Sequence, residues 1–142
     1  MRIKILILMG LFCLSTSIFG QEIGSVIIGN HSVKLLKSND LFACVYSDLN
    51  STSKDIHHKT FNFPIKETIY QIIMDGFKTN SSRQIFVKTD EYTIVKFDYK
   101  IIDGQLKLAI NHNDLYTQLI GVSTYLTQKQ VKSLFGITTN FG

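Results

Sequence analysis

The stretch YTIVKFDYKIIDGQLKLAIN, Tyr92–Asn111, decides the fold class of this 142-residue chain. Two runs of alternating apolar and polar residues flank Asp103-Gly104, a dipeptide that favours the two-residue turn of a β-hairpin. The turn sets the register, because a slip of one residue would move every side chain to the other face. It predicts three apolar pairs on one face: Ile101 with Leu106, Tyr99 with Leu108 and Phe97 with Ile110.

The opposite face of this hairpin is polar and mostly basic. It pairs Lys100 with Lys107 and Lys96 with Asn111, and Asp98 lies between the two lysines of its own strand. Like charges directly opposite each other destabilise a sheet slightly. We therefore take Lys96, Lys100 and Lys107 as a candidate binding surface for an acidic partner or a glycan.

Further strands are expected on both sides of the hairpin. Turn residues such as Gly29-Asn30 and Asn39-Asp40 separate short runs rich in β-branched and aromatic residues. The predicted strands cover residues 26–28, 33–35, 41–47, 84–89 and 115–122.

Two helices complete the pattern. The first is expected to open at Asn62-Phe63-Pro64 and to close at Asp75-Gly76, with isoleucines at helical spacing on one face. The second is expected to begin at Thr127, where Gln130 completes a capping box, and to end at Gly136. The expected fold is α+β: an antiparallel sheet of about six strands, a helix packed across one face and a short C-terminal helix.

Residues 1–20 are predicted to be a secretory signal peptide. Arg2 and Lys4 flank the start of an apolar run, Ile5–Leu14, and small residues follow it. The run is too short to span a bilayer, which needs about 20 residues. We therefore expect an exported protein, secreted or periplasmic, without a transmembrane span after signal removal. Residues 21–142 are expected to form one domain, since 44% of the residues are apolar and only one is Pro.

Removal of the signal changes the charge and the cysteine count. Arg2 and Lys4 leave, so 13 of 15 basic residues remain against 11 acidic ones, and the net charge falls from +4 to +2. This small charge gives no support for nucleic-acid binding. Cys44 is the one cysteine left and lies in an apolar run, so we predict that it is buried rather than catalytic.

The polar segment Leu49–Thr60 has no periodicity and is predicted to be an exposed loop. It holds His57 and His58, which join the lysines as candidate binding residues. Together with His112 and Asp114 they have the chemistry of metal ligands, but no recognised metal-ligand spacing is present. Nucleophile-elbow and phosphate-loop motifs are also missing from the sequence, so no catalytic residue, cofactor or metal is assigned.

The sequence therefore predicts a small exported interaction module, such as an inhibitor, an immunity-type protein or an envelope accessory protein. Its partner would be another protein or a component of the cell envelope. Two alternatives stay open. One is a small hydrolase or metal-dependent enzyme using His57, His58 or His112. The other is a carrier of an apolar small ligand, lined by Tyr46, Tyr70, Phe86 and Tyr99.

Overall fold

The computed structural model describes residues 20–51 and 54–137, so the predicted signal peptide lies, except for Gly20, outside the described residues. The described chain is α+β, as expected. Its elements in order are β1 (Gln21–Ile28), β2 (His31–Ser38), β3 (Leu41–Ser47), β4 (His58–Phe63), α2 (Lys66–Lys78), β5 (Arg83–Lys88), β6 (Thr93–Ile102), β7 (Gln105–Asp114), β8 (Ile120–Val122), β9 (Leu126–Thr127) and α3 (Gln128–Leu134).

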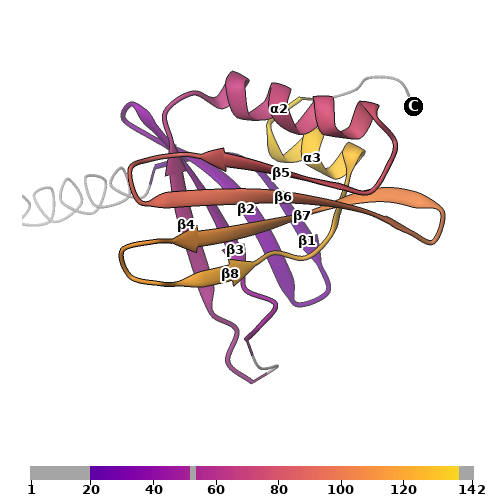
Figure 1. Cartoon of the computed structure of the whole chain (residues 1–142). Helices are drawn as coiled ribbons and strands as arrows, with labels where there is room; N and C mark the ends of the chain where they lie inside the picture. Colours follow the sequence, from indigo (N-terminus) through magenta and orange to yellow (C-terminus); the bar gives the residue numbers. More distant parts are fainter. Residues whose placement is uncertain (1–19, 52–53, 138–142) are drawn as a thin grey trace, which may run out of the picture.

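The strands form two antiparallel sheets, which corrects the expected single sheet of about six strands. The first sheet has the order β1-β2-β3-β4, and the second has the order β5-β6-β7-β8 with β9 paired to β7. The strands of one sheet run across those of the other (Figure 1). The helix α2 follows β4 and precedes β5, so the chain leaves the first sheet before it begins the second. Periodicity describes each strand alone and carries no information about which sheet it joins.

The central hairpin has the predicted register throughout. β6 pairs with β7 so that Phe97 faces Ile110, Tyr99 faces Leu108 and Lys100 faces Lys107. Phe97, Tyr99 and Leu108 are almost fully buried, which confirms the apolar face. Ile101 is the exception, at 53% exposed: the pairing of β5 with β6 ends at Arg83 and Tyr99, so no residue of β5 lies beside Ile101, whereas Leu106 opposite it is buried.

Two expectations about the middle of the chain are wrong. The segment Leu49–Thr60 is not wholly a loop, because β4 begins at His58 and pairs with β3. The first helix starts at Lys66 and continues through Gly76 to Lys78. Gly76 is buried inside the helix, where a Cβ atom would overlap the ring of Tyr99. This glycine therefore serves close packing rather than helix termination.

The C-terminal helix begins as predicted. Thr127 accepts a hydrogen bond from the Gln130 backbone N–H through its side chain, and the Gln130 side chain accepts one from the Thr127 backbone N–H. Leu126 and Val131, on either side of this cap, are both buried. Among the described residues, the helices are too short or too polar to cross a membrane.

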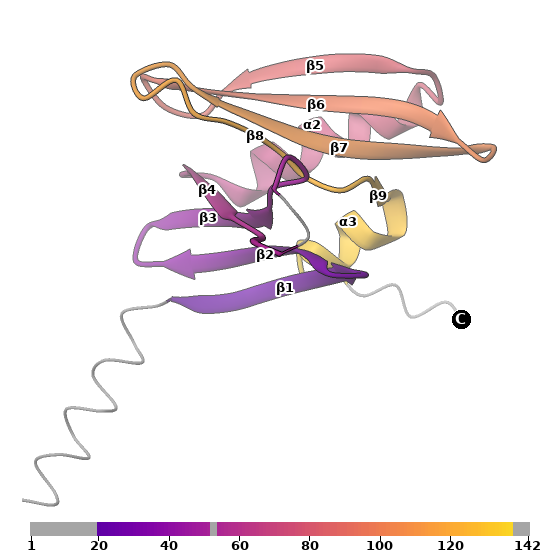
Figure 2. The ribbon, with the colours of Figure 1, turned by 90° about the horizontal axis from the view of Figure 1, so that it is seen from below.

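The core lies between the two sheets. Both helices occupy the space between the layers, so the sheets are held apart where α2 and α3 lie (Figure 2). Away from the helices the inner faces meet directly: the rings of Tyr46 and Phe61 on the first sheet lie 6.2 and 5.5 Å from His112 on the second. The outer face of the second sheet, with the basic row of the hairpin, stays free of helices.

Candidate functional site

The outer face of the second sheet is ordered in rows across its strands, because paired residues in a sheet point to the same side. The first row is Lys88, Ile94, Asn113 and Ile120; the second is Phe86, Lys96, Asn111 and Val122. The third row is Gln84, Asp98 and Ala109, and the fourth pairs Lys100 with Lys107 and reaches Thr127. The register of four strands therefore places apolar, amide and ammonium groups side by side.

A groove of about 300 Å³ lies along the first two rows. Its apolar part includes Phe86, which is 64% exposed, and Ile120, which is 57% exposed. Its polar part includes the ammonium group of Lys96 and the carboxamides of Asn111 and Asn113. Exposed aromatic and aliphatic side chains beside hydrogen-bonding groups are typical of binding surfaces.

The three candidate lysines do not have equivalent surroundings. Lys96 lines the groove. Lys100 lies beyond it and forms an ion pair with Asp98 at 3.9 Å. A hydrogen bond with the Tyr125 hydroxyl, followed by the charges of Tyr125 and Asp98, raises the pKa of Lys100. Lys107 is half-buried opposite Lys100. The structure therefore assigns Lys96 to the groove and leaves the other two as flanking charges.

One wall of the groove is the short strand β8, which the first sheet anchors. The Asp48 carboxylate accepts a hydrogen bond from the Val122 N–H at 3.1 Å, and the Leu49 N–H donates to the Val122 carbonyl at 2.8 Å. Lys59 forms an ion pair with Asp48 at 2.9 Å and also donates to the Ile120 carbonyl at 2.5 Å. These polar contacts hold β8 against β3 and β4.

Asp48 is buried and yet ionised. Burial alone would raise its pKa, but the hydrogen bond from Lys59 and those from the backbone of Val122 and Asn50 hold the pKa below its usual value. The carboxylate is thus a fixed negative charge under the groove wall, and it neutralises Lys59 there.

His112 lies on the inner face of β7; it is largely buried and also contributes to the lining of the groove. Its Nδ1 atom lies 3.1 Å from the hydroxyl of Tyr46, which is fully buried. Desolvation lowers the pKa of His112, and the charge of Lys59 lowers it further, while Asp114 and Asp90 act in the opposite direction. The buried imidazole, bonded to a phenol, thus joins the two sheets.

The other histidine candidates are not brought together with His112. His57 is exposed in the loop before β4, and His58 is the exposed first residue of that strand. Among residues 20–51 and 54–137, His, Cys, Asp and Glu side chains do not gather in groups of three that could hold a metal ion. The metal-dependent form of the enzyme alternative therefore has no three-ligand cluster among these described residues.

Cys44 and the residues of the carrier alternative are also separated. Cys44 is packed in the core, where desolvation raises its pKa to about 12, so the thiol is protonated and shielded. Tyr46 and Tyr99 are fully buried, whereas Phe86 points outward into the groove and Tyr70 packs on Phe135. These four aromatic side chains do not line one cavity.

Sequence reasoning missed the apolar half of the groove. Ile85-Phe86-Val87 is a continuous apolar run, so alternation could not tell which of its side chains face the core. The pairing of Phe86 with Lys96 decides it, and this pairing depends on the register between β5 and β6.

Comparison of the chain with protein-family models, with curated proteins and with solved structures found no match.

Proposed function

We propose that this chain is an exported interaction module whose groove, on the outer face of the second sheet, binds an acidic and apolar segment of a partner protein. The observation that carries the proposal is the exposed Phe86 ring beside Lys96 in a groove lined by two asparagines. Aromatic side chains anchor many protein interfaces, and the polar groups around them set the orientation of the bound segment. Export is supported by the pattern of residues 1–20.

The charge of the outer face selects an acidic partner. Four lysines, Lys88, Lys96, Lys100 and Lys107, lie in the rows of this face, against the single carboxylate of Asp98. Lys100 lies directly opposite Lys107, and like charges in this arrangement repel each other and destabilise a sheet. A carboxylate of the bound segment would relieve this repulsion and would steer the partner to the face.

The partner segment lies across the strands and does not extend the sheet at β8. The outer edge of β8 is already occupied, because Val122 bonds to Leu49 and Asp48, and the Ile120 carbonyl accepts from Lys59. Affinity would therefore come from side chains seated over Phe86 and Ile120 and from an ion pair with Lys96, and less from main-chain hydrogen bonds.

The test is selection from a displayed library of random peptides on immobilised residues 21–142, which contain every strand and helix described above. We expect enriched peptides to place Asp or Glu next to aromatic or aliphatic residues. Their binding should be lost with Lys96→Glu and with Phe86→Ser, and it should be kept with Lys34→Glu, which reverses an exposed charge on the first sheet. A second selection on Lys96→Glu should enrich basic peptides instead.

Two results would overturn the proposal. One is enrichment of peptides that bind wild-type protein and both groove variants equally. The other is selection of the same acidic peptides by wild-type protein and by Lys96→Glu. Thermal melting of each variant distinguishes a loss of binding from a loss of folding. We expect both groove variants to stay folded, because the substituted side chains are at the surface.

A further inference from the structure

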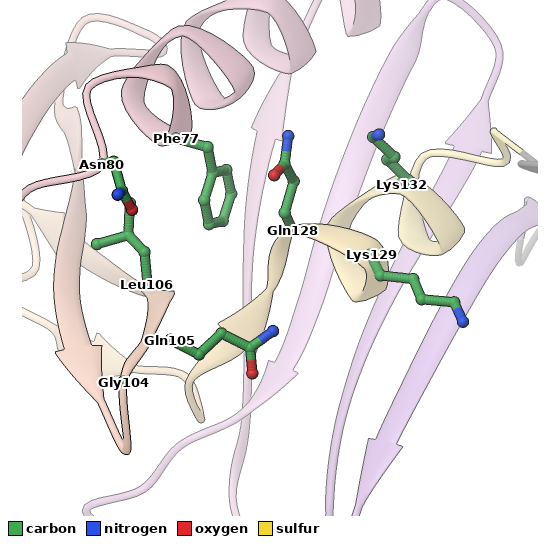
Figure 3. Close-up of a pocket in the computed structure, with 8 residues that line it drawn as sticks. All are labelled: Phe77, Asn80, Gly104, Gln105, Leu106, Gln128, Lys129 and Lys132. Atoms are coloured by element: carbon green, nitrogen blue, oxygen red, sulfur yellow. The ribbon is translucent and has the colours of Figure 1, made fainter.

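A second cavity, of about 430 Å³, lies where the end of α2, the β6–β7 turn and the start of α3 meet (Figure 3). It shares no lining residue with the groove and lies at the other end of the β6–β7 hairpin. Its volume falls within the range of about 300–1,000 Å³ that is usual for small-molecule sites. The cavity is therefore a candidate site for a small ligand rather than for a partner chain.

The floor of this cavity is apolar. Phe77 projects from the last turn of α2 into the space between Leu106 and Gln128 (Figure 3). Phe77 and Leu106 are 7% and 8% exposed, so each leaves only a small patch open. Such a floor suits a flat, weakly polar surface, such as the C–H face of a sugar ring.

Three carboxamides surround the floor, and each comes from a different part of the chain. Asn80 follows α2, Gln105 begins β7 and Gln128 begins α3. All three side chains are exposed, so their amide groups are open to solvent and to a ligand, and Gln128 also makes a long contact of 3.8 Å to the Met74 sulfur. A carboxamide both donates and accepts, as a hydroxyl group does, whereas an inorganic anion only accepts.

Two ammonium groups complete the lining. Lys129 and Lys132 lie one turn apart on α3, at one side of the cavity (Figure 3). In the part of the chain that the structure describes, neither forms an ion pair, and the lining contains no carboxylate. Asp103, in the β6–β7 turn next to Gly104, is exposed and is not part of the lining. The cavity thus combines unpaired positive charge with groups that match hydroxyls.

We propose that this cavity binds an anionic saccharide unit. Its hydroxyl groups exchange hydrogen bonds with Asn80, Gln105 and Gln128, its ring covers Phe77 and Leu106, and its acidic group pairs with Lys132, while Lys129 points away from the floor and adds positive charge at the rim (Figure 3). A sugar carboxylate and a sugar phosphate share this chemistry. The proposal is independent of the groove, because different residues form the two sites.

The test is a titration of ¹⁵N-labelled residues 21–142 followed by NMR. The probes are glucuronate, glucose 6-phosphate, neutral glucose and inorganic phosphate. We expect the amide resonances of Gly104, Gln105 and Gln128 to shift with at least one of the two sugar anions. That anion should act at a concentration about fivefold lower than glucose, which corresponds to the roughly 1 kcal/mol expected from one exposed ion pair. The sugar anion that binds more tightly identifies the acidic group.

Matched variants separate the contributions. Lys129→Gln with Lys132→Gln should weaken the sugar anion about fivefold and leave glucose unchanged. Lys34→Gln with Lys54→Gln removes two exposed charges outside the cavity and should change neither titration. Gln105→Ala should weaken the anion and glucose alike. The spectrum of each free variant reports whether it is folded.

Three results would overturn the proposal. The first is an absence of shifts at Gly104, Gln105 and Gln128 with every sugar. The second is equal affinity for glucose and for both sugar anions. The third is equal affinity for inorganic phosphate and the sugar anions, which would show that only the charge is recognised.

Discussion

Tyr46 and His112 belong to different sheets and share a hydrogen bond, with the phenolic oxygen 3.1 Å from Nδ1. They meet where the inner faces of the sheets touch without an intervening helix. Gly121 on β8 pairs with His112 and leaves the space that the Tyr46 hydroxyl occupies, since a Cβ atom there would overlap that hydroxyl. At this point the sheets are therefore joined by the Tyr46–His112 hydrogen bond, and their close approach requires that residue 121 has no side chain.

Gly121→Ala is expected to lower the free energy of unfolding by about 1–3 kcal/mol, because the added methyl group overpacks this contact. The loss should be smaller when Tyr46→Phe is also present, since the hydroxyl that meets the methyl group is then gone. Urea denaturation of the wild type, both single variants and the double variant measures the coupling, expected at roughly 0.5–3 kcal/mol. Additive losses in the double variant would show that the methyl group and the hydroxyl do not compete for this space.

Acid should destabilise the fold through His112. Desolvation lowers the pKa of the folded imidazole below its ordinary value of 6.5, so the unfolded chain takes up the proton first. The stabilisation from the neutral ring is complete above pH 6.5 and is lost as the pH falls toward the folded pKa. Asp48, whose folded pKa also lies below its ordinary value of 3.8, adds a further loss at still lower pH.

The melting temperature measured from pH 8 to pH 5 checks this. His112→Gln should remove most of the change in that interval, and His57→Gln, at an exposed histidine, should leave it in place. A pH dependence that is unchanged in His112→Gln would assign the effect to other groups.

Asp48→Ala is expected to lower the free energy of unfolding by roughly 2–4 kcal/mol, because it leaves Lys59 without its ion-pair partner and the Val122 N–H without its acceptor. Asp48→Asn keeps an acceptor oxygen for the Val122 and Asn50 N–H groups and should cost less. Hydrogen exchange provides the second measurement. The Val122 amide should exchange faster in Asp48→Ala than in Asp48→Asn, and equal rates would mean that the carboxylate does not anchor β8.

Gly76→Ala tests whether packing outweighs helix propensity. At an open helix position this change stabilises a protein by about 1 kcal/mol. Here the new methyl group would overlap Tyr99, whose hydroxyl donates to the Ile73 carbonyl at 2.7 Å, so we expect a net loss of about 1–3 kcal/mol. Thr68→Ala, at an exposed position of α2, serves as the control and should be neutral or slightly stabilising. Stabilisation by Gly76→Ala in a melting experiment would contradict the packing role.

Sequence alone determined the elements whose information is local. The Asp103-Gly104 turn specified the pairing of β6 with β7, and Thr127 with Gln130 specified the start of α3, because both patterns satisfy backbone groups within a few residues. The same turn placed Lys96 on the outer face of the hairpin, because it sets the register of β6 against β7.

Tertiary structure alone decided how the strands divide into two sheets and which side chains meet across them. The helix α2 separates β4 from β5, and no local pattern states that Asp48 anchors Val122 or that Tyr46 reaches His112. Phe86 joins Lys96 in the groove only through the register of β5 against β6. These relations depend on contacts between distant residues, whose geometry is settled by the joint packing of the whole core.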